Sequence, residues 1–368
     1  MRIEIDRRVL EEGLLRVARA VASKSTMPVL SNVLLSMEGD WLGIGATNLE
    51  ISMETRARAR GEAGKITAPA KRLIEICRDA PYDTIVIEGK DNGRAKIAAG
   101  RAKYEIPIIP AEDFPKIETD PGEDGATVDG FSLLWALNKV IRVVPSGDDV
   151  YGVPGVYLHR VESGIRFVAT DGHRLALATV DVGKLGGMEI GEKGAIIPKD
   201  AASALMHLLE GVKEAKMSLS ERRVFIETRE TRLSSLLIDV EFPDYETIIA
   251  DNFSCEVILP REETLSALKR ILPFASAGTF PVMLSLTAEG MGMECKSDDS
   301  GSASDCIRFN RSGEPDFTVA YNAKYMRDAL IALGSEKVRF AWVDGFRGGH
   351  FFDPENEGAL HLIMPLVV

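Results

Sequence analysis

The sequence has little of what marks membrane, exported or metal-binding proteins. No segment reaches the roughly 20 uninterrupted apolar residues of a membrane-spanning helix, and charged residues from Glu4 to Glu12 stand where a signal peptide has its apolar core. The four cysteines show no C-x-x-C spacing, and the five histidines form no metal-binding pair on a helix. We therefore expect a cytoplasmic protein without disulfides, metal, cofactor or membrane contact.

Sequence motifs of common enzymes are missing as well. There is no G-x-S-x-G nucleophile turn, no G-x-x-x-x-G-K-[ST] phosphate loop and no G-x-G-x-x-G after a strand. The formal charge of −12, from 44 basic and 56 acidic residues, argues against a nucleic-acid partner unless the charge is unevenly placed. With 368 residues the chain is long enough for two or three domains.

What the sequence does contain is a faint threefold repeat. Residues 46–48 (Ala-Thr-Asn) match residues 169–171 (Ala-Thr-Asp) 123 positions later, and Phe114-Pro115 matches Phe242-Pro243 at an offset of 128. Repeated landmarks in the same order indicate repeated domains. Alternatively, the thirds are unrelated domains whose parts look alike. The repeat predicts three domains, at 1–123, 124–252 and 253–368.

Each third contains two segments with apolar residues at helical spacing, each preceded by an extended run and followed by alternating strands. Turns with glycine, such as Gly39-Asp40 and Ser163-Gly164, join these strands as hairpins. The pattern predicts an α+β protein of three similar domains. We expect six helices, at 7–24, 71–78, 131–144, 199–213, 261–273 and 323–333.

The charge is unevenly distributed over these segments. The six expected helices carry +9 together, so the rest of the chain carries −21. If all helices lay on one side of the sheets, that side would attract a polyanion weakly, without reading sequence and with a steep salt dependence. Alternatively, the lysines and arginines serve helix propensity and solubility alone.

Two segments have more than one interpretation. In ATDGHRLA (169–176), Asp171 and His173 could perform acid–base chemistry, but Asp-Gly between two strands favours a tight turn. The chain ends in the apolar residues MPLVV, although chain ends are usually polar. These residues either complete a strand of the third domain or line a groove for an apolar segment of another protein.

Five segments together resemble the bacterial sliding clamp family, the β subunit of DNA polymerase III. They are TMPVLSNVLL (26–35), VATDGHRLA (168–176), FPDY (242–245), YNAKY (321–325) and the terminal MP (364–365). The resemblance implies a DNA-clamp fold with two helices per domain on antiparallel sheets, and a head-to-tail homodimer that closes a ring of six domains around duplex DNA. It also implies a processivity factor without catalytic residues, which slides on phosphates and tethers the polymerase.

The resemblance implies two sets of site residues. A pocket between the second and third domains would bind a short apolar partner peptide through Val153, Thr170, Gly172, His173, Arg174, Leu175, Pro243, Asn322, Tyr325, Met364, Pro365 and Leu366. Lys24 matches a basic loop residue of the family, and the helices offer further DNA-binding candidates, namely Arg72, Lys139, Lys199, Arg270 and Lys324. The loop 148–155 has one aromatic residue, Tyr151, and no basic residue, so its contact with DNA is in doubt.

The implied partners are double-stranded DNA, a second copy of the chain, the catalytic subunit of DNA polymerase III, an ATP-driven clamp loader, and other polymerases and repair proteins that carry a short clamp-binding peptide. Three other functions stay open. The chain could be a repeat-built scaffold that binds proteins but not DNA, a hydrolase centred on Asp171 and His173, or a clamp paralogue with altered partners and no replicative role.

Overall fold

The computed structural model describes residues 1–22, 24–90, 93–120, 125–145, 152–308 and 317–367. The chain divides into two compact units, one of residues 1–131, 185–189 and 203–238 and the other of residues 132–184, 190–202 and 239–368. All six predicted helices are present. They are α1 (Arg7–Val17), α2 (Ala70–Asp79), α3 (Gly130–Val140), α4 (Lys199–Leu209), α5 (Arg261–Ile271) and α6 (Ala323–Leu333).

Each helix belongs to the same supersecondary unit, which occurs six times along the chain. A strand leads into the helix, and three consecutive strands follow it, with the short β5 as an addition in the first third. Every strand pair in the described ranges is antiparallel. The α+β character and the internal repeat predicted from the sequence are therefore confirmed.

The helix ends follow from local sequence. Asp6 accepts hydrogen bonds from the backbone of the first turn of α1, and Gly334 ends α6 in the left-handed conformation at φ 74°. α1 and α5 end earlier than expected, because a 3-10 turn takes over at Ala18–Ala20 and at Leu272–Phe274. Among the described residues, none of the helices combines the length and the apolar character needed to cross a membrane.

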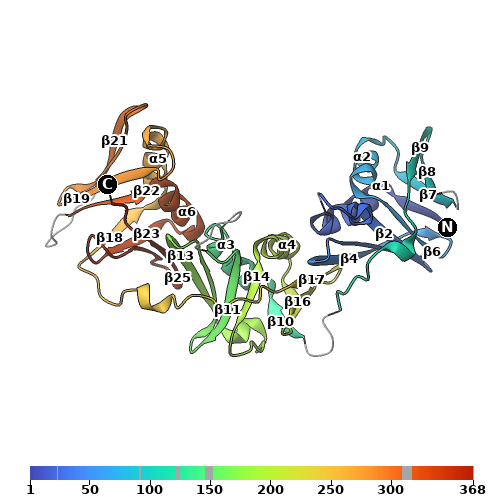
Figure 1. Cartoon of the computed structure of the whole chain (residues 1–368), viewed down its shortest axis with the longest axis horizontal. Coiled ribbons are helices and arrows are strands. Elements are labelled where there is room, and N and C mark those ends of the chain that lie inside the picture. The colour runs from blue at the N-terminus through green and yellow to red at the C-terminus, as the bar shows by residue number, and fades with distance from the viewer. Residues whose placement is uncertain (23, 91–92, 121–124, 146–151, 309–316, 368) are drawn as a thin grey trace. The chain divides into compact units, whose positions relative to one another are not determined.

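The first unit contains two sheets, and α1 and α2 lie side by side within it (Figure 1). The smaller sheet has the order β5 (Arg60–Gly61), β1 (Arg2–Asp6), β7 (Thr84–Lys90), β8 (Arg94–Ala99) and β9 (Ala102–Pro107). The larger has the order β10 (Ala126–Asp129), β15 (Glu214–Leu219), β16 (Arg223–Glu227), β17 (Thr231–Leu236), β4 (Ile51–Arg58), β3 (Trp41–Thr47), β2 (Asn32–Glu38) and β6 (Gly64–Pro69).

The larger sheet of this unit contains strands from both the first and the second repeat. β17 pairs with β4, so that Leu233 lies opposite Met53 and both are buried. On the helix side, Leu10 and Leu14 of α1 are fully buried, at the i, i+4 spacing of one helix face. The boundary between the first two repeats is therefore a continuous sheet over a shared core.

The second unit also contains two sheets. The larger has the order β14 (Ala195–Pro198), β11 (Gly155–Val161), β12 (Gly164–Thr170), β13 (Arg174–Val180), β25 (Asn356–Ile363), β24 (Gly349–Asp353), β23 (Lys337–Trp342) and β18 (Cys255–Pro260). The smaller has the order β21 (Gly301–Arg308), β20 (Gly290–Ser297), β19 (Pro281–Thr287) and β22 (Phe317–Asn322).

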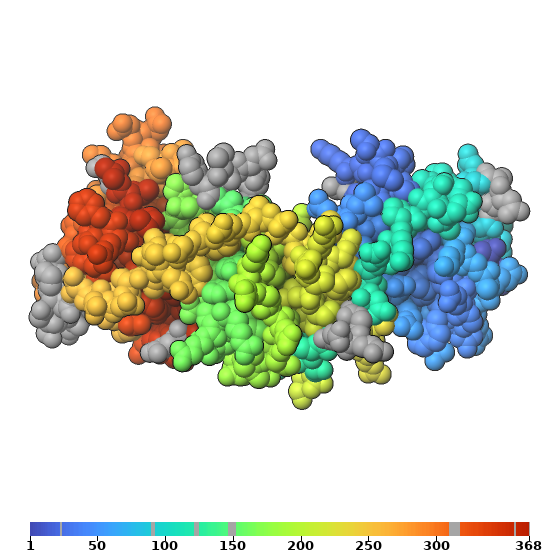
Figure 2. All heavy atoms as spheres, turned by 60° about the horizontal axis from the view of Figure 1, so that its bottom comes forward, coloured from blue at the N-terminus to red at the C-terminus, as the bar shows by residue number. Residues whose placement is uncertain are grey.

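The second unit repeats the same kind of boundary. β13 pairs with β25, with Ala176 opposite His361. The segment after β17 crosses the outer face of the β11–β13 strands, as the yellow band over green in Figure 2 shows. There the Phe242 ring stacks on Tyr157 with 4.6 Å between ring centres, which fixes the crossing segment to the sheet.

Candidate functional site

The turn between β12 and β13 is held by its own side chains. Thr170 Oγ1 donates to the Arg174 carbonyl over 2.9 Å and accepts the Gly172 N–H over 3.2 Å. Asp171 Oδ1 accepts the backbone N–H groups of His173 and Arg174, each over 3.1 Å. Gly172 has φ 83°, which glycine adopts without steric cost. The predicted turn is confirmed, and it presents an exposed His173 on a fixed backbone.

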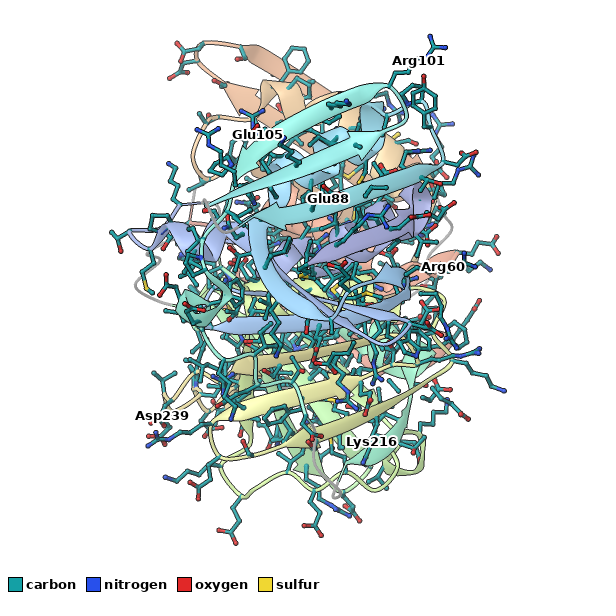
Figure 3. All side chains as sticks on the ribbon, turned by 90° about the vertical axis from the view of Figure 1, so that its right-hand side faces the viewer. Arg60, Glu88, Arg101, Glu105, Lys216 and Asp239 are labelled. Carbon is teal, nitrogen blue, oxygen red and sulfur yellow. The ribbon has the colours of Figure 1, made fainter. Side chains whose placement is uncertain are left out.

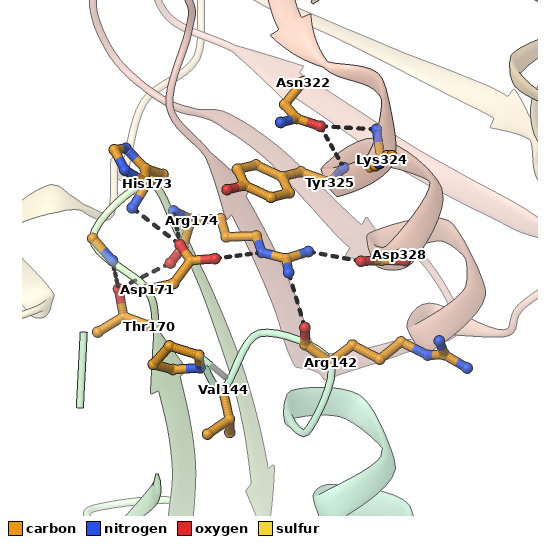
Figure 4. Close-up of polar contacts among 12 residues, drawn as sticks. Arg142, Val144, Thr170, Asp171, His173, Arg174, Asn322, Lys324, Tyr325 and Asp328 are labelled. Atoms are coloured by element: carbon orange, nitrogen blue, oxygen red, sulfur yellow. Dashed lines mark hydrogen bonds and ion pairs between the residues drawn. The ribbon is translucent and has the colours of Figure 1, made fainter. Parts of the chain in front are cut away.

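The Arg174 side chain links three parts of the second unit (Figure 4). Its Nε donates to Asp171 over 2.8 Å, and its Nη1 donates to Asp328 on α6 over 3.0 Å. Its Nη2 donates to the Arg142 carbonyl over 2.9 Å, and the guanidinium lies 4.1 Å from the centre of the Tyr325 ring. All three guanidinium nitrogens donate within the chain, so Arg174 ties β13 to α6. Its contact with a partner peptide stays a prediction.

The apolar end of the chain runs past this turn. The Met364 N–H donates to the His173 carbonyl over 2.9 Å, and the Leu366 N–H donates to the Ala320 carbonyl of β22 over 2.8 Å. The second contact is an isolated bridge and not a full strand. Met364, Pro365 and Leu366 stay half-buried. The chain end thus makes one strand-like contact with the third repeat and still offers apolar surface beside the turn. Neither alternative, a completed strand or the lining of a groove, is excluded by this arrangement.

An apolar cluster underlies the turn. Leu175 is buried in it, and Met364 and Phe242 pack against it partly exposed. Pro243, next to Phe242, is exposed. Leu175, Met364 and the FPDY segment come from distant parts of the sequence, so the structure brings together residues that the resemblance assigned to one pocket.

Other residues implied for the pocket lie on α6, where Tyr325 packs against the core of the third repeat. Asn322 Oδ1 accepts the backbone N–H groups of Lys324 and Tyr325, over 2.9 and 3.2 Å, and so begins α6. Val153, Thr170, Leu175 and Asn322 are buried, Arg174 and Tyr325 are half-buried, and Gly172 and His173 are exposed. Tyr151, with residues 148–150 of its loop, lies outside the described residues.

Three of the cations expected to bind DNA are exposed. Lys24 is exposed, and Arg72 and Arg270 keep 68% and 59% of their side-chain area accessible. Arg72 pairs with Glu75 over 2.8 Å, and Arg270 pairs with Asp305 on β21 over 2.6 Å. Their contact with DNA stays a prediction.

Two further candidate cations are partly engaged within the second unit. Lys199 Nζ donates to the Val144 carbonyl over 2.6 Å, and burial lowers the pKa of Lys199. Lys324 Nζ lies 3.3 Å from the centre of the Phe280 ring, a cation–π contact. Both residues are half-buried, so they are less accessible to a partner than Lys24, Arg72 and Arg270.

The expectation that Lys139 faces DNA is wrong. Its side chain is buried, with 6% of the residue exposed, and its amine donates to the Leu333 carbonyl at the end of α6. Burial lowers the pKa of Lys139. A helix C-terminus favours a nearby cation, because its last carbonyls carry partial negative charge. Helical position alone did not show that this face of α3 packs inward.

Comparison with known proteins finds one family along nearly the whole chain. Models of the N-terminal, central and C-terminal domains of the DNA polymerase III beta subunit match residues 1–118, 133–244 and 246–367. The chain belongs to the DNA polymerase III beta subunit family. The chain is 30% identical to the Caulobacter vibrioides beta sliding clamp, over 100% of both chains.

Solved structures of this family have the same fold. The Caulobacter crescentus beta sliding clamp superposes with a TM-score of 0.90 at 29% identity, and the Pseudomonas aeruginosa DNA polymerase III subunit beta with 0.91 at 27%. Each match covers 100% of both chains. The predicted three-domain clamp fold is confirmed. So is the function, that of a sliding clamp, a non-catalytic processivity factor that tethers the polymerase.

Within a non-catalytic clamp, Asp171 has a structural role, because it holds the turn and Arg174. The sequence also gave no sign of Asp328, which completes the Arg174 contacts from a separation of 154 residues. Ile248, with 45% exposure three residues after Tyr245, is a further apolar residue near the cluster that sequence reasoning missed. A search for apolar residues within a few positions of FPDY could have found it.

Proposed function

We propose that two copies of this chain join head to tail in a closed ring that encircles duplex DNA and slides along it. The open sheet edges carry this proposal. Within the chain, repeats are joined by strand pairing, β17 with β4 and β13 with β25. In the described residues, β9 and β21 each end a sheet. Pairing β9 of one copy with β21 of the next would join the two copies in the same way as the repeats are joined within one chain. Two such head-to-tail contacts between two copies close a ring.

The two edges have opposite charge. The β8–β9 hairpin, residues 94–107, holds four cations and one carboxylate, whereas the β20–β21 hairpin, residues 290–308, holds four carboxylates and two cations. Figure 3 shows Arg101 and Glu105 of the first hairpin pointing away from the sheet. Complementary charge favours contact between unlike edges over contact between like ones.

The charge distribution supports a DNA-facing helix side. With the observed bounds, the six helices carry +5 and the rest of the chain carries −17. The excess is smaller than the sequence segments suggested, because the shorter α1 and α3 leave out Arg19, Lys24 and Arg142 and the longer α2 includes Asp79. We propose that Lys24, Arg72 and Arg270 contribute phosphate contacts, with Lys199 and Lys324 in lesser roles. Such contacts are weak and independent of base sequence, as sliding requires.

We propose that the surface formed by the 170–174 turn, the apolar cluster and residues 364–366 binds a short apolar peptide of partner proteins. These partners include the catalytic subunit of DNA polymerase III, the clamp loader, and other polymerases and repair proteins. The exposed His173 and the half-buried Met364 support this assignment. We place the protein in the cytoplasm and its three domains at 1–123, 124–252 and 253–368.

Retention on DNA tests the ring. The protein is loaded on circular and linear duplex DNA of equal length by a clamp loader, and retention is measured over time at rising salt. We expect persistence on circles and rapid loss from linear ends, with sedimentation at twice the monomer mass. Equal loss from both forms, or a monomer in sedimentation, would refute the ring.

A further inference from the structure

The first unit contains a hollow of about 750 Å³ on the outer face of its larger sheet. The alternation of side chains along the strand identifies this face: Met53 of β4 is buried, whereas its neighbour Glu54 is half-buried and lines the hollow. α1 packs on the opposite face, where a Cβ on Gly13 would lie 2.6 Å from the Ile44 side chain. The hollow therefore lies away from the helices and from the side that we propose to face DNA.

The floor of the hollow includes a glycine with open space above it. Gly43 of β3 faces Ser36 of β2 across the sheet, and both residues line the hollow. A Cβ placed on Gly43 would have the Ser36 carbonyl oxygen as its nearest neighbour, at 3.6 Å. The next outward-facing glycine of the strand, Gly45, differs because the Ile117 side chain covers it. The sheet thus leaves room for a side chain of another molecule above Gly43.

Trp41 forms one wall of the hollow, and one face of its ring is already occupied. The guanidinium of Arg58 lies 4.0 Å from the centre of the indole and pairs with Asp40 over 3.8 Å. Arg58 stands opposite Trp41 on β4, whereas Glu38 stands opposite Trp41 on β2. Trp41 remains 41% exposed, and it lines the hollow together with Glu38 but without Arg58. The ring face on the Glu38 side is therefore open to the hollow.

The charges around the hollow are mixed and partly paired. Four glutamates and three arginines line it. Glu227 and Glu230 each pair with an arginine, over 2.7 and 2.6 Å. Glu38 is exposed and forms no ion pair with a described residue, and the same holds for Arg56 and Arg229. The hollow thus offers both a carboxylate and cations to a ligand of mixed charge.

We propose that this hollow binds a segment of a partner protein in which an arginine lies close to a carboxylate. The guanidinium would stack on the open face of Trp41 and pair with Glu38. The chain itself uses this arrangement on the other ring face, with Arg58 and Asp40. The carboxylate of the segment would pair with the unpaired arginines of the lining, whereas the excess of glutamates over arginines disfavours a phosphate ligand. The inference goes beyond the proposed function, because the hollow belongs to the first unit and the 170–174 turn to the second.

The test uses the full-length protein and the NMR signals of its indole N–H groups. The chain has three tryptophans, and the Trp41 signal is the one that disappears in Trp41→Leu. The probe is a short peptide with one arginine and one glutamate among glycines and serines, compared with the same peptide carrying uncharged citrulline for arginine. We expect the arginine peptide to shift the Trp41 signal, and Glu38→Gln to weaken binding about fivefold, the effect of losing about 1 kcal/mol.

Filling the hollow tests its shape separately from its charge. Gly43→Val adds a side chain where a Cβ has only ordinary contacts, so the protein should fold and the peptide should no longer shift the Trp41 signal. Gly292→Val is the matched control, because Gly292 of β20 faces Ser285 with the same 3.6 Å distance and lies outside the hollow. Thermal melting checks that both variants are folded.

Several results would overturn the proposal. Equal binding of the citrulline peptide is one, and an unchanged affinity in folded Gly43→Val is another. A phosphoserine peptide without arginine that shifts the Trp41 signal, while the arginine peptide does not, would mean that the hollow selects an anion. Glu221→Gln removes an exposed carboxylate outside the hollow and should leave binding unchanged. A loss as large as in Glu38→Gln would reduce the effect to the overall charge of the chain and would also refute the site.

Discussion

Arg174 on β13 and Asp328 on α6 form an ion pair over 3.0 Å, with 11% and 17% of their side chains exposed. The same guanidinium pairs with Asp171 over 2.8 Å. We expect Arg174→Ala to lower the free energy of unfolding by about 3 kcal/mol, because the buried Asp171 carboxylate loses its cation and the half-buried Asp328 keeps only Arg327. Urea unfolding followed by circular dichroism measures this change.

A more exposed ion pair supplies the control for that prediction. Arg339 pairs with Glu256 over 2.8 Å, with 30% and 44% of the side chains exposed. Arg339→Ala should cost about 1–2 kcal/mol, because it removes this pair and the contact of the guanidinium with the Phe352 ring, whose centre lies 4.1 Å away. If Arg174→Ala cost no more than Arg339→Ala, the bridging role of Arg174 would be wrong.

Acid should destabilise the fold through His361. This side chain is buried on β25, and burial, followed by the charge of Arg174, lowers its pKa from 6.5 to about 3. Between these values the unfolded chain binds a proton that the folded chain does not, so the free energy of unfolding falls as pH falls from 6.5 toward 3. In His361→Leu the free energy of unfolding should fall less steeply with pH, by the slope that one bound proton contributes.

The measurement for His361 is urea unfolding at a series of pH values. His207 is 48% exposed on its side chain, and His207→Leu serves as the matched control. An identical pH slope in the wild type and His361→Leu would show that this histidine does not contribute to acid sensitivity.

The first repeat contains a strained copy of the 170–174 turn. Leu49 has φ 78°, and its N–H donates to Thr47 Oγ1 over 3.0 Å, as Gly172 donates to Thr170. The left-handed conformation costs a leucine about 1–2 kcal/mol, whereas glycine adds about 0.5–1 kcal/mol of unfolded-state entropy. We expect Leu49→Gly to stabilise by about 0.5 kcal/mol. Gly172→Leu is the reciprocal variant and should destabilise; stabilisation by both would contradict the argument.

Two exposed arginines should differ in what they support. Arg72 pairs with Glu75 on its own helix, whereas Arg270 pairs with Asp305 on the edge strand β21 and lowers the pKa of that carboxyl. We expect Arg72→Glu to shorten retention on circular DNA and leave the dimer intact. Arg270→Glu should also shorten retention but tighten the dimer in sedimentation, because it frees the Asp305 carboxylate and adds negative charge beside the acidic edge that would face the basic β9 edge. Identical behaviour of the two variants would remove this distinction.

The exposed His173 should matter for partners and not for folding. We expect His173→Ala to weaken binding of the DNA polymerase III catalytic subunit about tenfold in surface plasmon resonance, as a contact of more than 1 kcal/mol would. Thermal melting should stay unchanged, since the side chain is exposed. His207→Ala is the control, and equal affinity of both variants would exclude His173 from the partner surface.

Much of the fold could be predicted because its signals are local. The apolar spacing of α1, the glycine turns of the hairpins and the Asp-Gly turn before His173 each act within a few residues. The end of α1 was less predictable, since the 3-10 turn at Ala18–Ala20 continues the same apolar pattern. Likewise, the pattern on α3 could not show that Lys139 packs against the end of α6.

The sequence by itself therefore determined the repeated strand–helix–strands unit, the turn chemistry and the family. Only the tertiary structure decided which charged side chains are engaged within the chain and which are exposed to a partner. Arg174 and Asp328 meet across 154 residues, and Lys139 reaches a carbonyl 194 residues away. Periodicity carries no information on contacts at such separations, because they depend on how β13, α3 and α6 pack together and not on the spacing within any one of them.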